Sequence, residues 1–354
     1  MSSKKELTYA EAIREATELA MLEDSRVVLM GLGVPDPKGI FGTTAGLSEK
    51  FGPERVLDAP ISENALTGMI VGGALTGLKP ILTHQRVDFA LLSLEQIINQ
   101  AAKWYYMFDG RGGTVPIVIR MIIGRGWGQG PQHSQSLHSL FAHIPGLRVV
   151  APSTPDEAKG VLLSAIRDPN PVIYLEHRWL HGLKGPVSVG SEGLPLSSAR
   201  VAREGKDLTI VSSSHGLIES LRAAEFLAEK AALEAEVIDL RTLNPLDWGT
   251  VEYSIARTRR LLVVDEDHRH CGFAAEILAR AVESPVEFVQ KPRRITLPDC
   301  PSPSSRFLAA AFYYTPRDIV AAALSLCSQN ASLADSYPLA QNSDQPSFYF
   351  PGPF

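Results

Sequence analysis

The stretch "DAPISENALTGMIVGGALTGLKP", Asp58–Pro80, decides how the first half of the chain folds. It begins at the end of a short apolar strand, "RVLDAP" (Arg55–Pro60), and small or apolar residues then follow almost without interruption. This run predicts a helix over about Ser62–Gly77 that is packed on all sides. One carboxylate, Glu63, stands at the start of that helix. Taken alone, an acid in the first turn is explained by the helix dipole, which it stabilises by about 0.3–1 kcal/mol.

Strands alternate with helices around this stretch. The expected strands are Arg26–Gly31, Arg55–Pro60, Lys79–His84, Val115–Ile123, Leu147–Pro152 and Asn170–Glu176. The expected helices lie over Ala10–Ala20, Ser62–Gly77, Leu91–Met107 and Pro155–Arg167. Several of the strands are apolar throughout, without the alternation of a half-exposed strand. That pattern is typical of a parallel sheet covered on both faces, so the sequence predicts an α/β fold.

A second series of the same kind follows a stretch rich in Gly, Pro and Ser, "GLKGPVSVGSEGLPLSS" (Gly182–Ser198). Its expected strands and helices are Asp207–Ser214, Leu217–Lys230, Glu234–Leu240, Arg260–Glu266, Gly272–Glu283 and Pro316–Cys327. We therefore predict two domains rich in parallel sheet. Their expected bounds are 1–181 and 207–327, with a linker over 182–206 and an extended tail over 328–354.

Composition excludes several classes of protein. The 354 residues carry a formal net charge of -5 and no basic run, which disfavours a nucleic-acid binder. The N-terminus lacks the apolar core of a signal peptide, and no stretch approaches the roughly 20 apolar residues that span a bilayer. The three cysteines lie far apart in the sequence. Such sparse cysteines are typical of a reducing compartment, so we expect a cytoplasmic location.

The Gly-rich turns do not match known phosphate-binding motifs, because none spells G-x-G-x-x-G or G-x-x-x-x-G-K-[ST]. The stretch "QGPQHSQSLHSLFAHIPG" contains His133, His138 and His143. A spacing of five does not place them on one helix face, which disfavours a metal triad. His133 directly follows a Gly/Pro loop, where parallel sheets expose functional side chains. Each of the three, considered alone, is more often a structural histidine.

Several segments occur together in one order: "DAPISENALTGMIVGGALTGLKPI", "LLSLEQIINQAAKWYYM", "VPIVIRM", "QHSQSLHSLFAHIPGLRVVAPSTPDEAKGVLLSAIRDPNPVIYLE" and "VIDLRTLNPLD". Together they resemble the β subunit of the decarboxylating component of 2-oxo-acid dehydrogenase complexes of the pyruvate, branched-chain and acetoin type. Transketolase is a more distant relative. The resemblance covers about residues 6–327. It implies a thiamine-diphosphate pyrimidine-binding fold followed by a transketolase C-terminal-like domain.

The resemblance assigns roles around the cofactor thiamine diphosphate. Glu63 matches the glutamate that contacts the aminopyrimidine ring nitrogen and stabilises the imino tautomer, which removes the proton from the thiazolium carbon. Ile61 and Phe89 match residues of the pyrimidine-binding pocket, with Phe89 packed on the ring. His133 matches the histidine near the thiazolium that assists acyl transfer. Glu63 and His133 are thus the expected catalytic residues.

The resemblance also implies a structural potassium ion. Its ligands would come from the segment "SAIRDPNP" and from the strand before it, and the matching positions are Ile117, Ala165, Ile166, Asp168 and Asn170. Carbonyl and carboxylate oxygens suit such a hard cation. The competing interpretation is a helix C-terminus followed by a turn.

One expected part of the family's cofactor site has no counterpart in the sequence. Relatives bind the diphosphate through magnesium, which is held by a GDG motif and a later Asn. The nearest string here, "FDGRGG" (Phe108–Gly113), lies in the wrong domain. We therefore expect an α subunit to hold the diphosphate and magnesium, in an α2β2 assembly. The expected acceptor of the acyl group is a lipoyl domain of an acyltransferase.

Four residues depart from the usual family pattern and are candidates for the substrate pocket: His84, Arg86, Arg125 and Trp127. Arginine is suited to carboxylate or phosphate, so these changes favour a polar or anionic substrate. The alternative is a repacked subunit interface.

Three functions compete at this level. The first is a 2-oxo-acid dehydrogenase β subunit. The second is a split transketolase-like enzyme that transfers a ketol or acyl group to an aldehyde. The third is a scaffold subunit without catalysis, which the presence of both Glu63 and His133 argues against.

Overall fold

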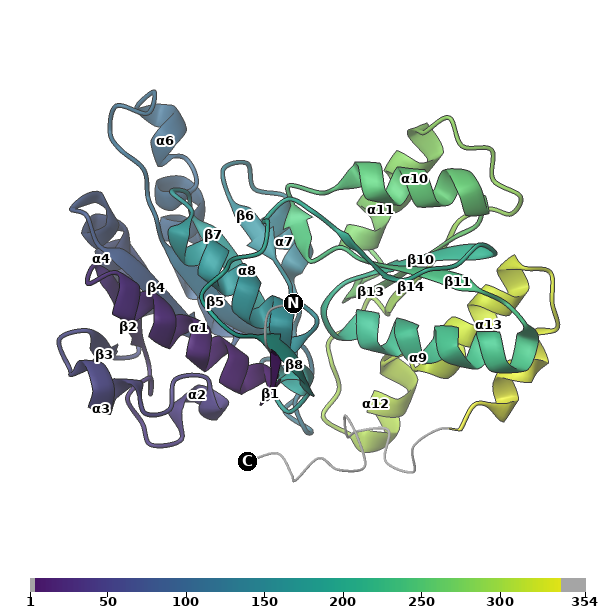
Figure 1. Cartoon of the computed structure of the whole chain (residues 1–354), viewed down its shortest axis with the longest axis horizontal. Coiled ribbons are helices and arrows are strands. Elements are labelled where there is room, and N and C mark those ends of the chain that lie inside the picture. Colours follow the sequence, from purple (N-terminus) through teal and green to yellow (C-terminus); the bar gives the residue numbers. More distant parts are fainter. Residues whose placement is uncertain (1–3, 339–354) are drawn as a thin grey trace.

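The computed structural model describes residues 4–338, which form two α/β lobes side by side (Figure 1). Within these residues, seven strands make the sheet of the first lobe, in the order β12-β6-β7-β5-β4-β2-β3. They are β2 (Val27–Gly31), β3 (Val56–Asp58), β4 (Lys79–His84), β5 (Val118–Ile123), β6 (Arg148–Val150), β7 (Val172–His177) and β12 (Thr242–Asn244). All neighbours run parallel except β12, which pairs antiparallel with β6.

Helices cover both faces of this sheet, as the continuous apolar strands predict. One layer contains α1 (Tyr9–Glu23) and α8 (Pro155–Arg167), which lie side by side in Figure 1 and share a core with the strands. Both begin at a threonine whose side chain forms a capping box with a glutamate three residues later. Two short helices, α2 (Gly39–Gly42) and α3 (Leu47–Phe51), complete the region near β3.

The opposite layer holds α4 (Glu63–Leu75) and the helical segment after β4. That segment was predicted as one helix over Leu91–Met107. It is instead divided into α5 (Val87–Ala90), a 3-10 turn η1 (Leu91–Ser93), a π-helix η2 (Glu95–Ala101) and α6 (Trp104–Met107). Helix α7 (His138–Ala142) closes this layer.

The prediction that α4 is packed on all sides is wrong for the isolated chain. Ile70, Val71 and Ala74 are buried against the sheet, but Met69 is 54% exposed on another face. Gly72 on the same helix has no atom within 4 Å of the position of a Cβ. The apolar content of α4 therefore exceeds what this chain alone buries.

The second lobe has a sheet in the order β14-β13-β10-β11-β9 within the described residues. Its strands are β9 (Arg200–Arg203), β10 (Leu208–Ser212), β11 (Ala235–Asp239), β13 (Leu261–His268) and β14 (Arg293–Leu297). Only β9 runs antiparallel to its neighbour. The helices are α9 (Ser214–Ala231), α10 (Trp248–Thr258), α11 (Phe273–Glu283), α12 (Arg306–Phe312) and α13 (Pro316–Leu326), followed by the 3-10 helix η4 (Ala331–Ser336).

The segment expected as a linker, 182–206, contains two strands. β8 (Lys184–Ser188) pairs with β1 (Lys4–Thr8) as a separate ribbon, and β9 joins the second sheet. The 3-10 turn η3 (Arg178–Leu180) precedes this segment. The domain bounds stay a prediction. Most of the expected tail, from residue 339 onward, lies outside the described residues.

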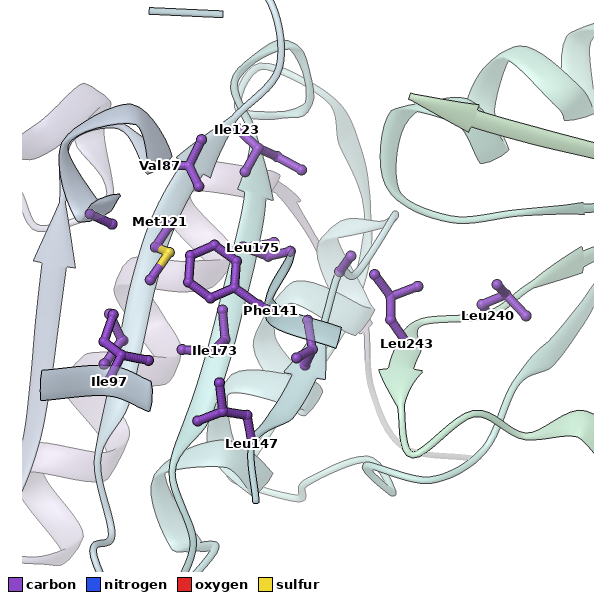
Figure 2. Packing of buried hydrophobic residues seen from close by; sticks show 14 of the residues in the cluster. Val87, Ile97, Met121, Ile123, Phe141, Leu147, Ile173, Leu175, Leu240 and Leu243 are labelled. Carbon is purple, nitrogen blue, oxygen red and sulfur yellow. The ribbon is translucent and has the colours of Figure 1, made fainter. Parts of the chain in front are cut away.

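The two lobes share one apolar core. Phe141 of α7 packs between side chains of β5 and β7, among them Met121 and Leu175, and Leu243 approaches from the second half of the sequence (Figure 2). Burial of each such side chain stabilises the fold by about 1.5–3 kcal/mol. Apolar packing therefore continues from the first lobe into the second, in addition to the core that each lobe has of its own. No helix in the described part of the chain has both the length and the apolar character that crossing a membrane requires.

Candidate active site

A small pocket opens where β2 and β4 end, beside the first turn of α4. Its lining consists of Gly31, Leu32, Pro60, Ile61, Glu63, Leu66, Leu82, Thr83, His84, Gln85 and Phe89. The carboxyl ends of parallel strands are where α/β folds place ligands. Three expected cofactor residues, Ile61, Glu63 and Phe89, therefore meet in one pocket although they come from different elements.

The pocket depends on close backbone approach between β2 and β4. A Cβ on Gly31 would lie 2.5 Å from the carbonyl oxygen of Thr83, so only glycine fits at the end of β2. The turn that leads into α4 is fixed by Asp58, whose carboxylate accepts the N–H groups of Gly33 and Ala59 at 2.9 Å each. Glu63 is the first residue of α4, and its side chain is half-buried.

His133 joins the pocket through Phe89. Their rings meet edge to face, with centroids 5.2 Å apart, a favoured aromatic geometry. The loop that carries His133 follows β5, whereas Phe89 lies in α5 after β4. Glu63 thus lines the same pocket as Phe89, and His133 packs against Phe89.

His84, the last residue of β4, lines the pocket and is buried. Burial lowers the pKa of its imidazole to about 4, because the charged form loses water. His84 is therefore neutral at pH 7. Its Nε2 atom has no hydrogen-bond partner within the described residues.

The other three substrate-pocket candidates lie outside the lining of this pocket. Arg86 is buried, and its guanidinium donates to the carbonyl oxygen of Gly124 at 2.8 Å. Arg125 stacks 3.5 Å from the ring centre of Trp179 and 4.3 Å from that of Tyr313. Both contacts are cation–π interactions.

Trp127 packs at the same place, with its ring 6.3 Å from that of Trp179. The guanidinium of Arg178 lies 5.1 Å from its ring centre. A part in substrate selection for Arg86, Arg125 and Trp127 stays a prediction.

The residues expected around potassium lie at the end of α8 and beside β5. The carbonyl of Ile117 accepts the N–H of Val172, and the carbonyl of Ala165 accepts that of Asp168. The Asp168 carboxylate accepts the backbone N–H of Asn170 at 2.8 Å and pairs with the guanidinium of Arg148 at 2.8 Å. The side chain of Ile166 is buried. The two carbonyl oxygens each have a second lone pair that a cation can use. A potassium site at these residues stays a prediction.

Acidic residues at the end of β13 meet histidines from both lobes, which the sequence did not indicate. His138 Nε2 lies 2.7 Å from Asp265. Glu266 lies between His215, at 2.9 Å, and His177, at 3.1 Å. Although burial would raise it, the pKa of Glu266 is held well below its usual range by the two imidazoles. These residues are distant in sequence, so no motif could have revealed the cluster.

His177, His215 and Glu266 are close enough to be considered as metal ligands, the one such group within the described residues. However, Nδ1 of His177 accepts the backbone N–H of Trp179 at 3.1 Å. A backbone amide only donates, so the proton of neutral His177 must lie on Nε2, which faces Glu266. The cluster is therefore a polar junction between the lobes, in which Glu266 hydrogen-bonds His215 and lies 3.1 Å from His177.

Comparison with known proteins agrees with this geometry. Residues 5–182 match the family model described as "Transketolase, pyrimidine binding domain", and residues 197–319 match "Transketolase, C-terminal domain". A solved structure titled "Split gene transketolase, inactive beta4 tetramer" shares the fold, with a TM-score of 0.75 at 21% identity. It covers 91% of this chain and 99% of its own. The fold and the pocket thus define a two-domain, transketolase-like protein.

Curated relatives narrow the class. The β subunit of acetoin:2,6-dichlorophenolindophenol oxidoreductase from Cupriavidus necator is 42% identical over 87% of this chain and 96% of its own length. The mitochondrial β subunit of the pyruvate dehydrogenase E1 component from Pisum sativum is 40% identical over 94% of both chains. The chain belongs to this family of E1-type β subunits. The predicted fold class is confirmed.

Proposed function

We propose that this chain is the β subunit of a heteromeric, thiamine-diphosphate-dependent 2-oxo-acid dehydrogenase. The enzyme decarboxylates a 2-oxo acid and passes the acyl group to a lipoyl domain. One observation carries the proposal: Glu63 and Phe89 line one pocket, and His133 lies against Phe89. The membership of the β-subunit family supports it.

The pocket has the chemistry that an aminopyrimidine requires. Its wall contains two buried polar atoms without a partner among the described residues, His84 Nε2 and Thr83 Oγ1. Unpartnered buried groups cost about 1–3 kcal/mol each, and a bound ligand with donors and acceptors removes that cost. Leu66, Leu82 and Phe89 supply apolar walls for the ring. These residues fit the pyrimidine half of the cofactor.

When bound, thiamine diphosphate supplies a carbon nucleophile for the keto carbon of the substrate. Glu63 would hold the pyrimidine ring nitrogen by sharing a proton with it, in a site that the partner subunit would shield further. Phe89 fixes the ring by packing. His133 lies against Phe89, and its imidazole would donate or accept a proton during acyl transfer.

The diphosphate and its magnesium belong to a second chain in this proposal, an α subunit in an α2β2 assembly. The sequence lacks the GDG motif that would hold them. Exposed apolar side chains support such a contact: Ile61, in the pocket lining just before α4, is 76% exposed, and Met69 on α4 is 54% exposed. A lipoyl acyltransferase as the acceptor and a cytoplasmic location stay predictions.

Glu63→Gln in the reconstituted α/β enzyme tests the proposal. The change keeps shape but removes the carboxyl proton, so decarboxylation of 2-oxo acids should fall at least 100-fold while assembly is retained. The matched control is Glu54→Gln, because Glu54 is an exposed acid outside the pocket. Retained activity in Glu63→Gln would contradict the assignment. Thiamine-diphosphate binding by the lone chain at full affinity would contradict the shared site.

The split transketolase alternative is not favoured. The structure that carries that title is only 21% identical and supports the fold alone. The relatives at 39–42% identity are pyruvate and acetoin enzymes.

A further inference from the structure

Arg86 is a charged side chain placed inside the protein just before α5. It is 3% exposed. Its Nη1 atom donates to the carbonyl oxygen of Gly124 at 2.8 Å, and its Nη2 atom donates to the side-chain oxygen of Gln129. Burial lowers the pKa of the guanidinium to about 10, which leaves it protonated at neutral pH. A buried charge is tolerated when such hydrogen bonds compensate the lost hydration.

Both partners of Arg86 belong to one loop, residues 124–135, which we call the His133 loop. The N–H of Gly124 donates to the carbonyl of Gln135 at 2.9 Å and closes the base of the loop. A Cβ on Gly126 would lie 2.7 Å from Arg86 Nη2. The guanidinium therefore fills the inside of the loop.

Two neighbours of Arg86 contact the same loop. The carboxylate of Asp88 accepts a hydrogen bond from the Gln135 side chain at 2.7 Å. Phe89 meets the ring of His133. The turn Arg86–Phe89 thus contacts the His133 loop in three places. Asp88 contacts its base, Arg86 its interior and Phe89 the ring of His133.

We propose that Arg86 is a positioning residue that fixes the His133 loop on the α5 turn and so sets the place of the His133 imidazole. The inference rests on the proposed function for its kinetic part. It also changes the expectation from sequence, where Arg86 was a candidate for direct contact with an anionic substrate. A positioning role follows from the partners: both known acceptors of the guanidinium are atoms of the loop.

Hydrogen–deuterium exchange of the full chain tests the structural part, with Arg86→Met compared with wild type. The peptide that spans the His133 loop should exchange at least tenfold faster in the variant, because its internal support is lost. Arg55→Met is the matched control. Arg55 also holds backbone carbonyls, those of Met21, Asp24 and Val27, but far from the loop. Unchanged loop exchange in Arg86→Met would overturn the proposal.

Kinetics of the reconstituted α/β enzyme separate positioning from substrate contact. A misplaced His133 should lower kcat about 10- to 100-fold and change KM for the 2-oxo acid less than threefold. Arg86→Lys keeps the charge but places all its N–H donors on one nitrogen, so it should recover part of kcat. A large rise in KM with kcat unchanged would assign Arg86 to the substrate and overturn the positioning role.

A second variant keeps the test decisive should Arg86→Met fail to fold. Gln129 is exposed, so Gln129→Ala removes one partner of Arg86 without a cavity in the core. The peptide that spans the His133 loop should again exchange faster than in wild type, but by less than in Arg86→Met. An inactive wild-type pair would reject the proposed function, whereas the exchange result would still decide whether Arg86 supports the loop.

Discussion

His138 and Asp265 join the two lobes: the imidazole Nε2 of the first lies 2.7 Å from a carboxylate oxygen of the second. Asp267, two residues further on β13, lies 3.8 Å from the same nitrogen and accepts the N–H of Ser139. Burial alone would lower the pKa of His138. The carboxylates of Asp265 and Asp267, with Glu266 nearby, outweigh burial and raise the pKa to about 9.

This contact predicts a pH-dependent stability. The folded-state pKa of His138, about 9, lies above its ordinary value of 6.5. Its contribution is therefore fully present below pH 6.5 and is lost as the pH rises to 9. A shift of this size corresponds to about 3 kcal/mol at most. Urea unfolding should show that the free-energy difference between wild type and His138→Gln shrinks over this range.

A constant difference across pH 6.5–9 would contradict the contact. His143→Gln is the control, because His143 is an exposed histidine on the same segment. Below pH 6.5 the opposite effect is expected from His84, whose pKa is lowered to about 4. Its protonation favours the unfolded chain, so stability should decline between pH 6.5 and 4.

Gly124→Ala should destabilise the fold by about 2–5 kcal/mol. Gly124 has φ +78°, which costs other residues about 1–2 kcal/mol, and a Cβ there would lie 1.9 Å from Nε2 of His177. Gly113→Ala is a close control, because Gly113 has the same φ with open space around it. Thermal unfolding of both variants measures the two losses of stability, and their difference is the cost of the clash between the new Cβ and His177. Equal losses would refute the close contact between Gly124 and His177.

Arg120 and Glu176 form an ion pair with no exposed surface on either side chain, at 2.9 Å. Arg120→Met should cost about 3–5 kcal/mol, because it leaves a buried carboxylate without its partner. The double variant Arg120→Met with Glu176→Leu should recover most of that loss. Arg111→Met, at an exposed pair with Asp109, should change stability by less than about 0.5 kcal/mol. Additive effects of the two core changes would speak against this pairing.

His133→Asn should lower kcat of the reconstituted enzyme about 10²- to 10⁴-fold and leave thiamine-diphosphate affinity nearly unchanged. The reason is that His133 packs against the ring of Phe89 but is absent from the lining of the pyrimidine pocket. His270→Asn, at an exposed histidine, is the control. A loss of cofactor affinity equal to the loss of kcat would place His133 in the binding pocket.

Much of the local structure was predictable from residue patterns. Pro155–Arg167 is a helix with the expected bounds, because Thr154, Pro155 and Glu157 carry the signals of a helix start. The buried parallel strands followed from their apolar runs. By contrast, the helix expected over Leu91–Met107 is interrupted by a π-helix with i→i+5 hydrogen bonds, whose buried residues Ile97 and Ala101 pack in the same core as α4 and the sheet.

The candidate site divides in the same way. Glu63, Phe89 and His133 were proposed because they match positions of the family that several segments of the chain resemble, and their roles stay predictions. The sequence by itself determined most of the α/β elements, because hydrophobic periodicity and helix-start signals are local properties. Only the tertiary structure places the guanidinium of Arg86 inside the His133 loop and the imidazole of His138 against a carboxylate of the other lobe. Their partners, a backbone carbonyl at Gly124 and a carboxylate at Asp265, are remote in sequence and leave no local pattern.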